Sequence, residues 1–117
     1  MAAELELVLD CADLDRQVEF WVGALGYRHV DSEGGYALLA PPEGERGPNF
    51  ILQRVPEPKT VKNRFHLDLK VPDIEAEATR LSGIGARRLR DEPIEELGER
   101  WIPMADPEGN EFCVCRC

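Results

Sequence analysis

The chain has 117 residues, of which 43% are hydrophobic and 32% are charged. This composition is typical of one soluble globular domain and argues against a disordered segment. The 23 acidic residues outnumber the 14 basic ones, and the net charge of −9 disfavours binding to nucleic acid or to an anionic membrane surface. No apolar run approaches the roughly 20 residues that cross a bilayer, and the first residues lack a signal-peptide pattern. We therefore expect a cytoplasmic protein with reduced cysteines and no nucleic-acid or membrane partner.

The first half of the chain predicts a strand, a helix and three further strands. Residues 5–11 alternate as a strand does, and Asp13 then offers the N-cap of a helix that ends at Gly26. Three strands are predicted over 27–30, 36–40 and 49–55. We expect the helix to bury one apolar stripe, made by Leu14, Val18, Trp21, Val22 and Leu25.

The second half repeats this order of elements. Residues 65–71 alternate with period two and predict a strand, and Asp73 caps a helix that ends at Gly85. The predicted apolar stripe of this helix is Ile74, Ala78, Leu81 and Ile84. Strands are predicted over 87–89, 101–105 and 112–116.

Two sequence matches indicate that the halves are duplicates. Residues 11–14 match residues 71–74, and residues 39–44 match residues 104–109 at nearly the same spacing. Such a repeat indicates a tandem strand–helix–three-strand module. We expect a single α+β domain, with module 1 over about 1–58, a proline-containing linker over about 56–63 and module 2 over about 64–117.

Three motifs point to a protein family. They are His-Leu-Asp-Leu-Lys-Val-Pro-Asp at 66–73, Phe-Trp followed by Leu-Gly at 20–26, and Asp-Pro-Glu-Gly-Asn at 106–110. With them the chain resembles the vicinal oxygen chelate superfamily, which includes glyoxalase I, bleomycin-resistance proteins, fosfomycin-resistance enzymes and extradiol dioxygenases. Residues 53–59 and 62–64 are similar to a glyoxalase-like branch of it. The resemblance implies two βαβββ modules whose curled mixed sheets surround a central cleft, a small-molecule ligand in that cleft, and a homodimer.

Strand parity selects the residues expected to face this cleft. In the strand over 65–71 the apolar alternates should face the helix, which leaves His66, Asp68 and Lys70 on the other face. Polar groups inside a sheet are costly unless they are paired or functional. Asp68 and Asp10 are equally open to structural pairing with Lys70. The predicted ligand-binding residues are Glu6, Asp10, Tyr36, Gln53, His66, Asp68, Trp101 and Cys113, with Tyr36 and Trp101 as aromatic walls.

The resemblance also implies a metal site with one ligand from each of four strands. Carried onto this chain, the ligands are Glu6, Gln53, His66 and Cys113. The family motif ends in a glutamate where this chain has Cys113, and Glu111 lies two residues earlier on the same strand face. The mixed ligand set leaves Zn, Fe, Ni or Mn as candidates, but the changed position favours a degenerate site that holds no metal. His66 is the candidate catalytic residue, as a general base or a metal ligand, while a packed or hydrogen-bonded histidine is the alternative.

Two functions fit these residues. The first is a small-molecule-binding superfamily protein, with metal-assisted lyase, isomerase or dioxygenase chemistry but without glyoxalase I activity, because the glutamate ligand is missing. The alternative is a non-catalytic sequestration protein of the bleomycin-resistance type, and a structural domain with a vestigial cleft is a third reading. Four basic residues form an island in the acidic chain, either as a solvated surface or as an attraction for an anionic ligand: Arg54, Lys59, Lys62 and Arg64. The thiols of Cys113, Cys115 and Cys117 should share one face of the last strand, most simply as inert thiols.

Overall fold

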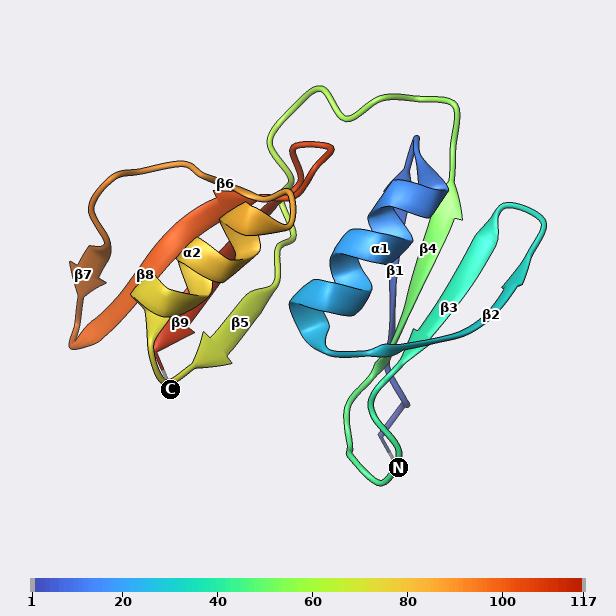
Figure 1. Cartoon of the computed structure of the whole chain (residues 1–117), viewed down its shortest axis with the longest axis horizontal. Coiled ribbons are helices and arrows are strands. Elements are labelled where there is room, and N and C mark those ends of the chain that lie inside the picture. Colours follow the sequence, from blue (N-terminus) through green and yellow to red (C-terminus); the bar gives the residue numbers. More distant parts are fainter. Residues whose placement is uncertain (1, 117) are drawn as a thin grey trace. The chain divides into compact units, whose positions relative to one another are not determined.

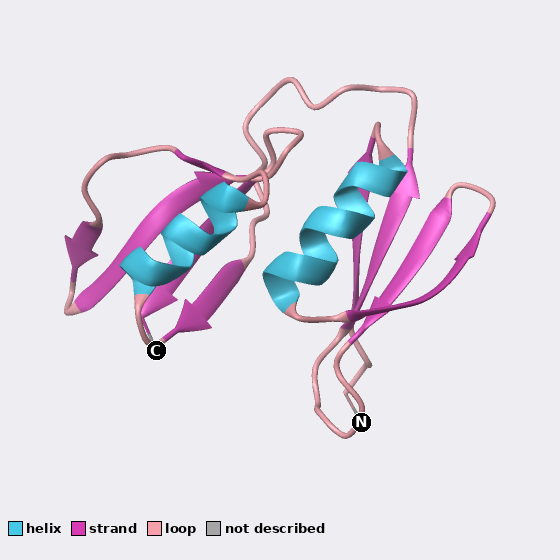
Figure 2. Cartoon of the chain, viewed as in Figure 1, coloured by secondary structure: helices cyan, strands magenta, loops and turns pink. Residues whose placement is uncertain are grey.

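The computed structural model describes residues 2–116 and divides into two compact units, Met1–Pro58 and Lys59–Cys117. Each unit consists of one helix packed on a mixed sheet (Figures 1 and 2). The predicted α+β class with tandem βαβββ modules is confirmed. Within residues 2–116 no helix is long and apolar enough to cross a membrane.

The first unit is a four-stranded sheet in the order β1-β4-β3-β2. The first and last strands of the unit, β1 and β4, are parallel neighbours, and the other pairs are antiparallel. A parallel pair needs a crossover connection, which here includes α1. The elements are β1 (Glu6–Cys11), α1 (Leu14–Leu25), β2 (Arg28–Glu33), β3 (Tyr36–Ala40) and β4 (Asn49–Arg54).

Helix α1 begins and ends where the sequence predicts, but it buries a different stripe. The Asp13 side chain accepts a hydrogen bond from the Arg16 amide at 3.2 Å, and Gly26 ends the helix with a φ of 69°. The buried residues are Leu14, Gln17, Phe20, Trp21 and Ala24, whereas Val18, Val22 and Leu25 are only half-buried. The predicted stripe was therefore wrong at these three positions. The reason is that the fully buried residue Gln17 lies on the helix face that packs against the sheet, so a stripe chosen from apolar residues alone assigns the wrong face.

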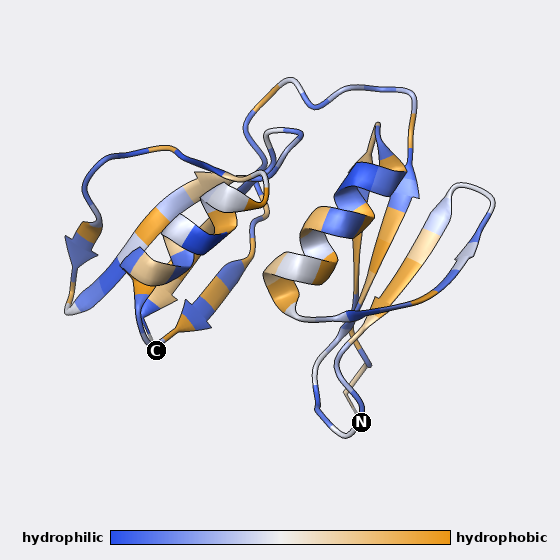
Figure 3. Cartoon of the chain, in the orientation of Figure 1, coloured by the Kyte–Doolittle hydropathy of each residue, from blue (hydrophilic) through white to orange (hydrophobic). Residues whose placement is uncertain are grey.

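The second unit repeats this layout around a five-stranded sheet. The strand order is β5-β9-β8-β6, β7 pairs with the remaining part of β8, and β5 and β9 are parallel as β1 and β4 are. The elements are β5 (Asp68–Val71), α2 (Ile74–Gly83), β6 (Arg87–Arg88), β7 (Ile94–Glu96), β8 (Glu99–Ala105) and β9 (Glu111–Arg116). Hydrophilic and hydrophobic residues alternate along β5, as Figure 3 shows, because one face of this sheet packs on α2.

Helix α2 confirms its predicted cap but ends early. The Asp73 side chain accepts a hydrogen bond from the Ala76 amide at 3.0 Å, and Ile74, Ala78 and Leu81 are buried. The helix ends at Gly83 and Ile84 is its C-cap, with 42% of its surface exposed. The prediction that Ile84 belongs to the buried stripe was therefore wrong, because the chain leaves the helix before that turn is complete.

Two strands of the second unit differ from the prediction. Strand β5 begins at Asp68, so the predicted strand over 65–71 was too long, and Phe65 is 81% exposed. Strand β7 was not predicted, since three residues are too few to show an alternating pattern. It joins β8 through a two-residue turn at Leu97 and Gly98, with φ values of 52° and 78°, as in a type I′ hairpin.

Candidate functional site

The sheet face opposite the helix carries the predicted site residues in both units. Along β1 the residues Glu6, Val8 and Asp10 are exposed, while the residues between them are half-buried. Along β5 the exposed residues are Asp68 and Lys70. This alternation agrees with the parity from which the residues were chosen.

Three of the predicted residues form a polar row across the first sheet. Asp10 on β1 lies opposite Gln53 on β4, and Gln53 lies opposite Tyr36 on β3. The Gln53 side-chain amide donates a hydrogen bond to the Tyr36 hydroxyl at 3.2 Å. The row therefore presents a carboxylate, an amide and a phenol side by side.

The same register places Glu6 away from Gln53. Glu6 lies opposite Asn49, and Gln53 is four residues further along β4. At about 3.3 Å per residue this is roughly 13 Å of strand. The structure therefore does not bring together the two residues of the first unit that the family pattern suggests as metal ligands.

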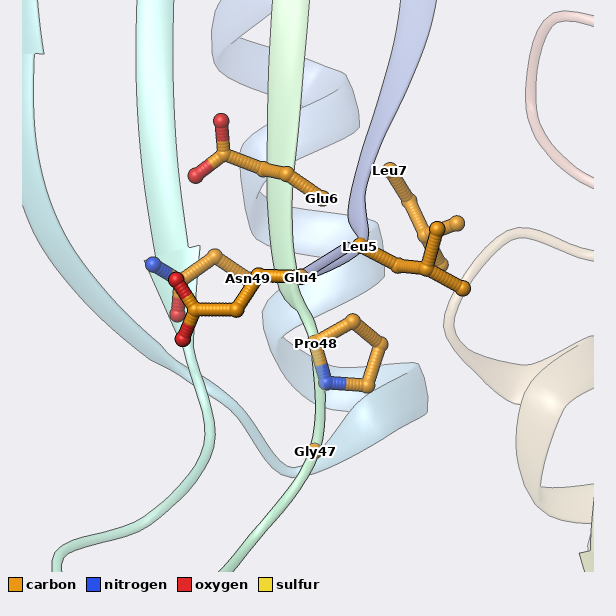
Figure 4. Close-up of a pocket in the computed structure, with 7 residues that line it drawn as sticks. All are labelled: Glu4, Leu5, Glu6, Leu7, Gly47, Pro48 and Asn49. Atoms are coloured by element: carbon orange, nitrogen blue, oxygen red, sulfur yellow. The ribbon is translucent and has the colours of Figure 1, made fainter. Parts of the chain in front are cut away.

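Glu6 lines a pocket at the beginning of β1 and β4. The pocket measures about 640 Å³, and in Figure 4 the Glu6 side chain points away from those of Leu5 and Leu7. Its lining residues are Glu4, Leu5, Glu6, Leu7, Gly47, Pro48 and Asn49. A ligand in this pocket would contact Glu6 without contacting the polar row.

The second unit does bring candidate ligands together. His66 Nε2 lies 3.4 Å from Asp68 Oδ1, and the ligand atoms of His66, Asp68 and Cys113 all lie within 4.8 Å of one another. Asp68 is the neighbour of Cys113 across the parallel pair β5–β9, and His66 lies two residues before Asp68, where that strand begins. We call these three residues the His–Asp–Cys cluster. The sequence predicted Asp68 as a ligand-binding residue or a structural partner but not as a metal ligand, although its spacing of two from His66 was a usable signal.

The thiol of Cys113 in this cluster and the neighbouring thiol of Cys115 are both held in the protonated form. Burial raises the pKa of Cys113, the Asp68 carboxylate raises it further, and Lys62 opposes the shift. Burial, followed by the charge of Asp68, raises the pKa of Cys115 to about 11. The thiolate is the reactive form of cysteine, so neither thiol is an activated nucleophile at neutral pH. Cys117, the third predicted thiol, lies outside the described residues.

Comparison with known proteins identifies the family. The model of the glyoxalase-like domain matches residues 6–115. This chain belongs to the glyoxalase-like domain family. No curated protein matches it.

Solved structures share the fold of this glyoxalase-like domain at low sequence identity. A glyoxalase/bleomycin resistance protein/dioxygenase family enzyme from Burkholderia phytofirmans superposes with a TM-score of 0.80 at 15% identity, covering 97% of this chain and 98% of that one. The fosfomycin resistance protein FosX from Mesorhizobium loti gives 0.77 at 15% identity, with 100% and 93% covered. TioX from Micromonospora sp. gives 0.69 at 22% identity, with 98% of each chain covered.

In this glyoxalase-like domain Glu111 is already engaged by other partners. Lys59 Nζ lies 3.0 Å from Glu111 Oε1 and donates to Oε2 at 3.1 Å, while the Asn63 amide donates to Oε1 at 3.0 Å. Burial acts to raise the pKa of Glu111, but the hydrogen bonds from Asn63 and Lys59 lower it overall. The Glu111 carboxylate, two residues before Cys113, is therefore occupied by an ion pair with Lys59 and a hydrogen bond from Asn63.

The His–Asp–Cys cluster offers one nitrogen, one oxygen and one sulfur atom to a metal. This donor set suits Zn²⁺ or Fe²⁺, whereas Mg²⁺ and Mn²⁺ prefer oxygen ligands. A coordinated thiol loses its proton to the solvent, so the raised pKa of Cys113 lowers metal affinity without preventing binding. Trp101 on β8 lies opposite Cys115 and supplies an aromatic surface on the adjoining part of the same face.

Proposed function

We propose that this protein binds a small, oxygen-bearing molecule at a divalent metal held by His66, Asp68 and Cys113. The single observation that carries the proposal is the approach of three different ligand atoms to within 4.8 Å of one another. The side chains of His66 and Asp68 are 43% and 50% exposed, which leaves room for a ligand to reach them. Three protein ligands are typical of catalytic sites, where a further position is kept for water or substrate.

The residues around the cluster have distinct roles in this proposal. Trp101 on β8, which lies opposite Cys115, forms an aromatic wall beside the cluster. Lys62 acts on Cys113 and Lys70 on Cys115, so both bring positive charge to this face, which suits a ligand with anionic or strongly polar oxygens. When bound, the metal would act as a Lewis acid toward those oxygens.

The remaining predicted contacts belong to the first unit. We assign the row of Asp10, Gln53 and Tyr36 to hydrogen bonding with a ligand, and Glu6 to the pocket at the start of β1. The reaction class is metal-assisted lyase, isomerase or dioxygenase chemistry without glyoxalase I activity. The proposal includes a cytoplasmic homodimer, which sedimentation analysis of the purified protein would test.

Metal titration of protein purified without an affinity tag tests the proposal. Co²⁺ should bind in a 1:1 complex with a cobalt–thiolate absorption band, which Cys113→Ser should abolish. His66→Ala removes a proposed ligand, so it should weaken binding by more than the roughly 10–100-fold that loss of a supporting group costs. His29→Ala is the matched control, since His29 is exposed in the first unit, where its ring shares a 2.6 Å hydrogen bond with Ser32. A wild-type protein without the cobalt band would refute the metal site.

A second candidate is sequestration without a metal, of the bleomycin-resistance type. It is favoured by the raised pKa values of both thiols and by the engagement of Glu111 with Lys59. Calorimetry with a cationic, bleomycin-like ligand separates the two functions. Binding that is unchanged by chelator and by Cys113→Ser would favour sequestration over the metal site.

A further inference from the structure

The segment that carries His66 lies outside the sheet and is held by an ion pair and hydrogen bonds. Residues 59–67, all within the described part of the chain, belong to no helix or strand. Two attachments tie this segment to β9. Glu111 binds Lys59 and Asn63 at one end, and the Cys113 amide donates to the Leu67 carbonyl at 2.9 Å at the other.

The first attachment, which we call the Glu111 clasp, consists of Glu111, Lys59 and Asn63. The side chains of Lys59 and Glu111 are only 17% and 21% exposed. Such a partly buried, charge-assisted contact is stronger than an ordinary surface ion pair. Asn63 is held a second time, because its side chain donates to Asn110 Oδ1 at 3.1 Å.

The spacing of the two attachments forces the segment to bend. Glu111 and Cys113 are two residues apart on β9, which corresponds to about 6.5–7 Å, whereas the four steps from Asn63 to Leu67 would span roughly 13 Å if extended. The surplus chain forms the bend at residues 64 and 65. The bend turns Phe65 outward, to 81% exposure, and leaves His66 Nε2 at 3.4 Å from Asp68.

We propose that Glu111 is a positioning residue, which with Lys59 and Asn63 fixes the bend that presents His66 to Asp68 and Cys113. The consequence for metal affinity rests on the proposed function, while the bend itself does not. In the clasp the carboxylate two residues before Cys113 faces Lys59 and Asn63. It also gives Lys59, a member of the basic island, a specific role.

Two metal-free measurements test the bend. The chain has only two histidines, so the ring signals of His66 and His29 are readily told apart by NMR, with His29 in the first unit as the internal reference. Glu111→Ala should shift the His66 signals and leave those of His29 in place. Trypsin cleavage after Lys62 and Arg64 should accelerate by about tenfold, because a released segment opens locally at lower free energy.

Three further variants keep the test independent of misfolding. Glu111→Gln retains an acceptor for the Asn63 amide but loses the charge, so it should give a smaller change in the same direction. Lys59→Met should resemble Glu111→Gln, and Lys59→Arg should restore the wild-type signals. The control is Glu75→Ala, which breaks the 2.7 Å ion pair with Arg88 in the same unit and should leave both readouts within twofold of the wild type.

Cobalt titration then links the clasp to the proposed function. Glu111→Ala should weaken Co²⁺ binding by about tenfold, as loss of a supporting residue does, while keeping the thiolate band. If Glu111→Ala shifts the His66 signals and the wild-type protein binds no Co²⁺, the clasp is supported and only the metal site is refuted. Unchanged His66 signals in Glu111→Ala would overturn the clasp, even if cleavage accelerates. Complete loss of Co²⁺ binding with unchanged His66 signals would overturn it as well, by making Glu111 a ligand.

Discussion

Replacing Leu97 by asparagine should stabilise the protein, although the folded chain gains no contact. Leu97 is the first residue of the β7–β8 turn, with a φ of 52°, and its side chain is fully exposed, at 102%. A left-handed conformation costs an L-residue roughly 1–2 kcal/mol, and asparagine tolerates it better than leucine does. No burial is lost with the side chain, so we expect a gain of about 0.5–1 kcal/mol. For a domain of this size that corresponds to a rise in Tm of about 2–6 °C.

Urea unfolding measures this gain. Leu97→Asn should move the midpoint to higher urea without changing the slope, because the surface exposed on unfolding is the same. Leu97→Ala is the control for side-chain removal and should be nearly neutral, since alanine keeps the strained backbone. Gly98→Ala should cost about 1 kcal/mol, because Gly98 has a φ of 78°. A destabilised Leu97→Asn would mean that Leu97 makes a contact in solution and that backbone strain does not decide this turn.

Three further outcomes follow from the local geometry. Gly47→Ala should destabilise the protein by about 1–3 kcal/mol in urea unfolding. Gly47 has a φ of 155°, and a Cβ there would lie 2.9 Å from the Tyr27 hydroxyl, which donates to the Pro48 carbonyl. A neutral effect would contradict this close approach of Gly47 to Tyr27. Cys113→Glu should raise Mn²⁺ affinity relative to Cd²⁺ in competitive titrations, since it exchanges a soft ligand for a hard one, and an unchanged preference would remove Cys113 from the metal site. The pKa of Glu111 is lowered in the folded state, so its stabilising contribution is present above the ordinary carboxyl pKa of about 4.3 and is lost as the pH falls through the lower folded value. Glu111→Gln should flatten this dependence of stability on acid pH. An unaltered pH profile of stability would contradict this contribution of Glu111.

The sequence by itself determined the features that depend on neighbouring residues. The caps at Asp13 and Asp73 and the αL end at Gly26 were predicted correctly, because capping is decided within one turn of helix. The alternation along β1 was also predictable, since successive strand residues point to opposite faces. These local patterns and the repeat predicted the fold class, while the family followed from the resemblance that rests on the motifs at 20–26, 66–73 and 106–110.

Only the tertiary structure decided which polar residues meet. The register of β1 against β4 sets Gln53 beside Asp10 and away from Glu6, and the sequence of one strand carries no signal for its alignment with another strand. The grouping of His66 with Asp68 and Cys113 depends likewise on the β5–β9 pairing and on the Glu111 clasp. Such contacts join residues far apart in the chain, so their geometry is decided by packing, loop length and hydrogen bonding across the whole unit.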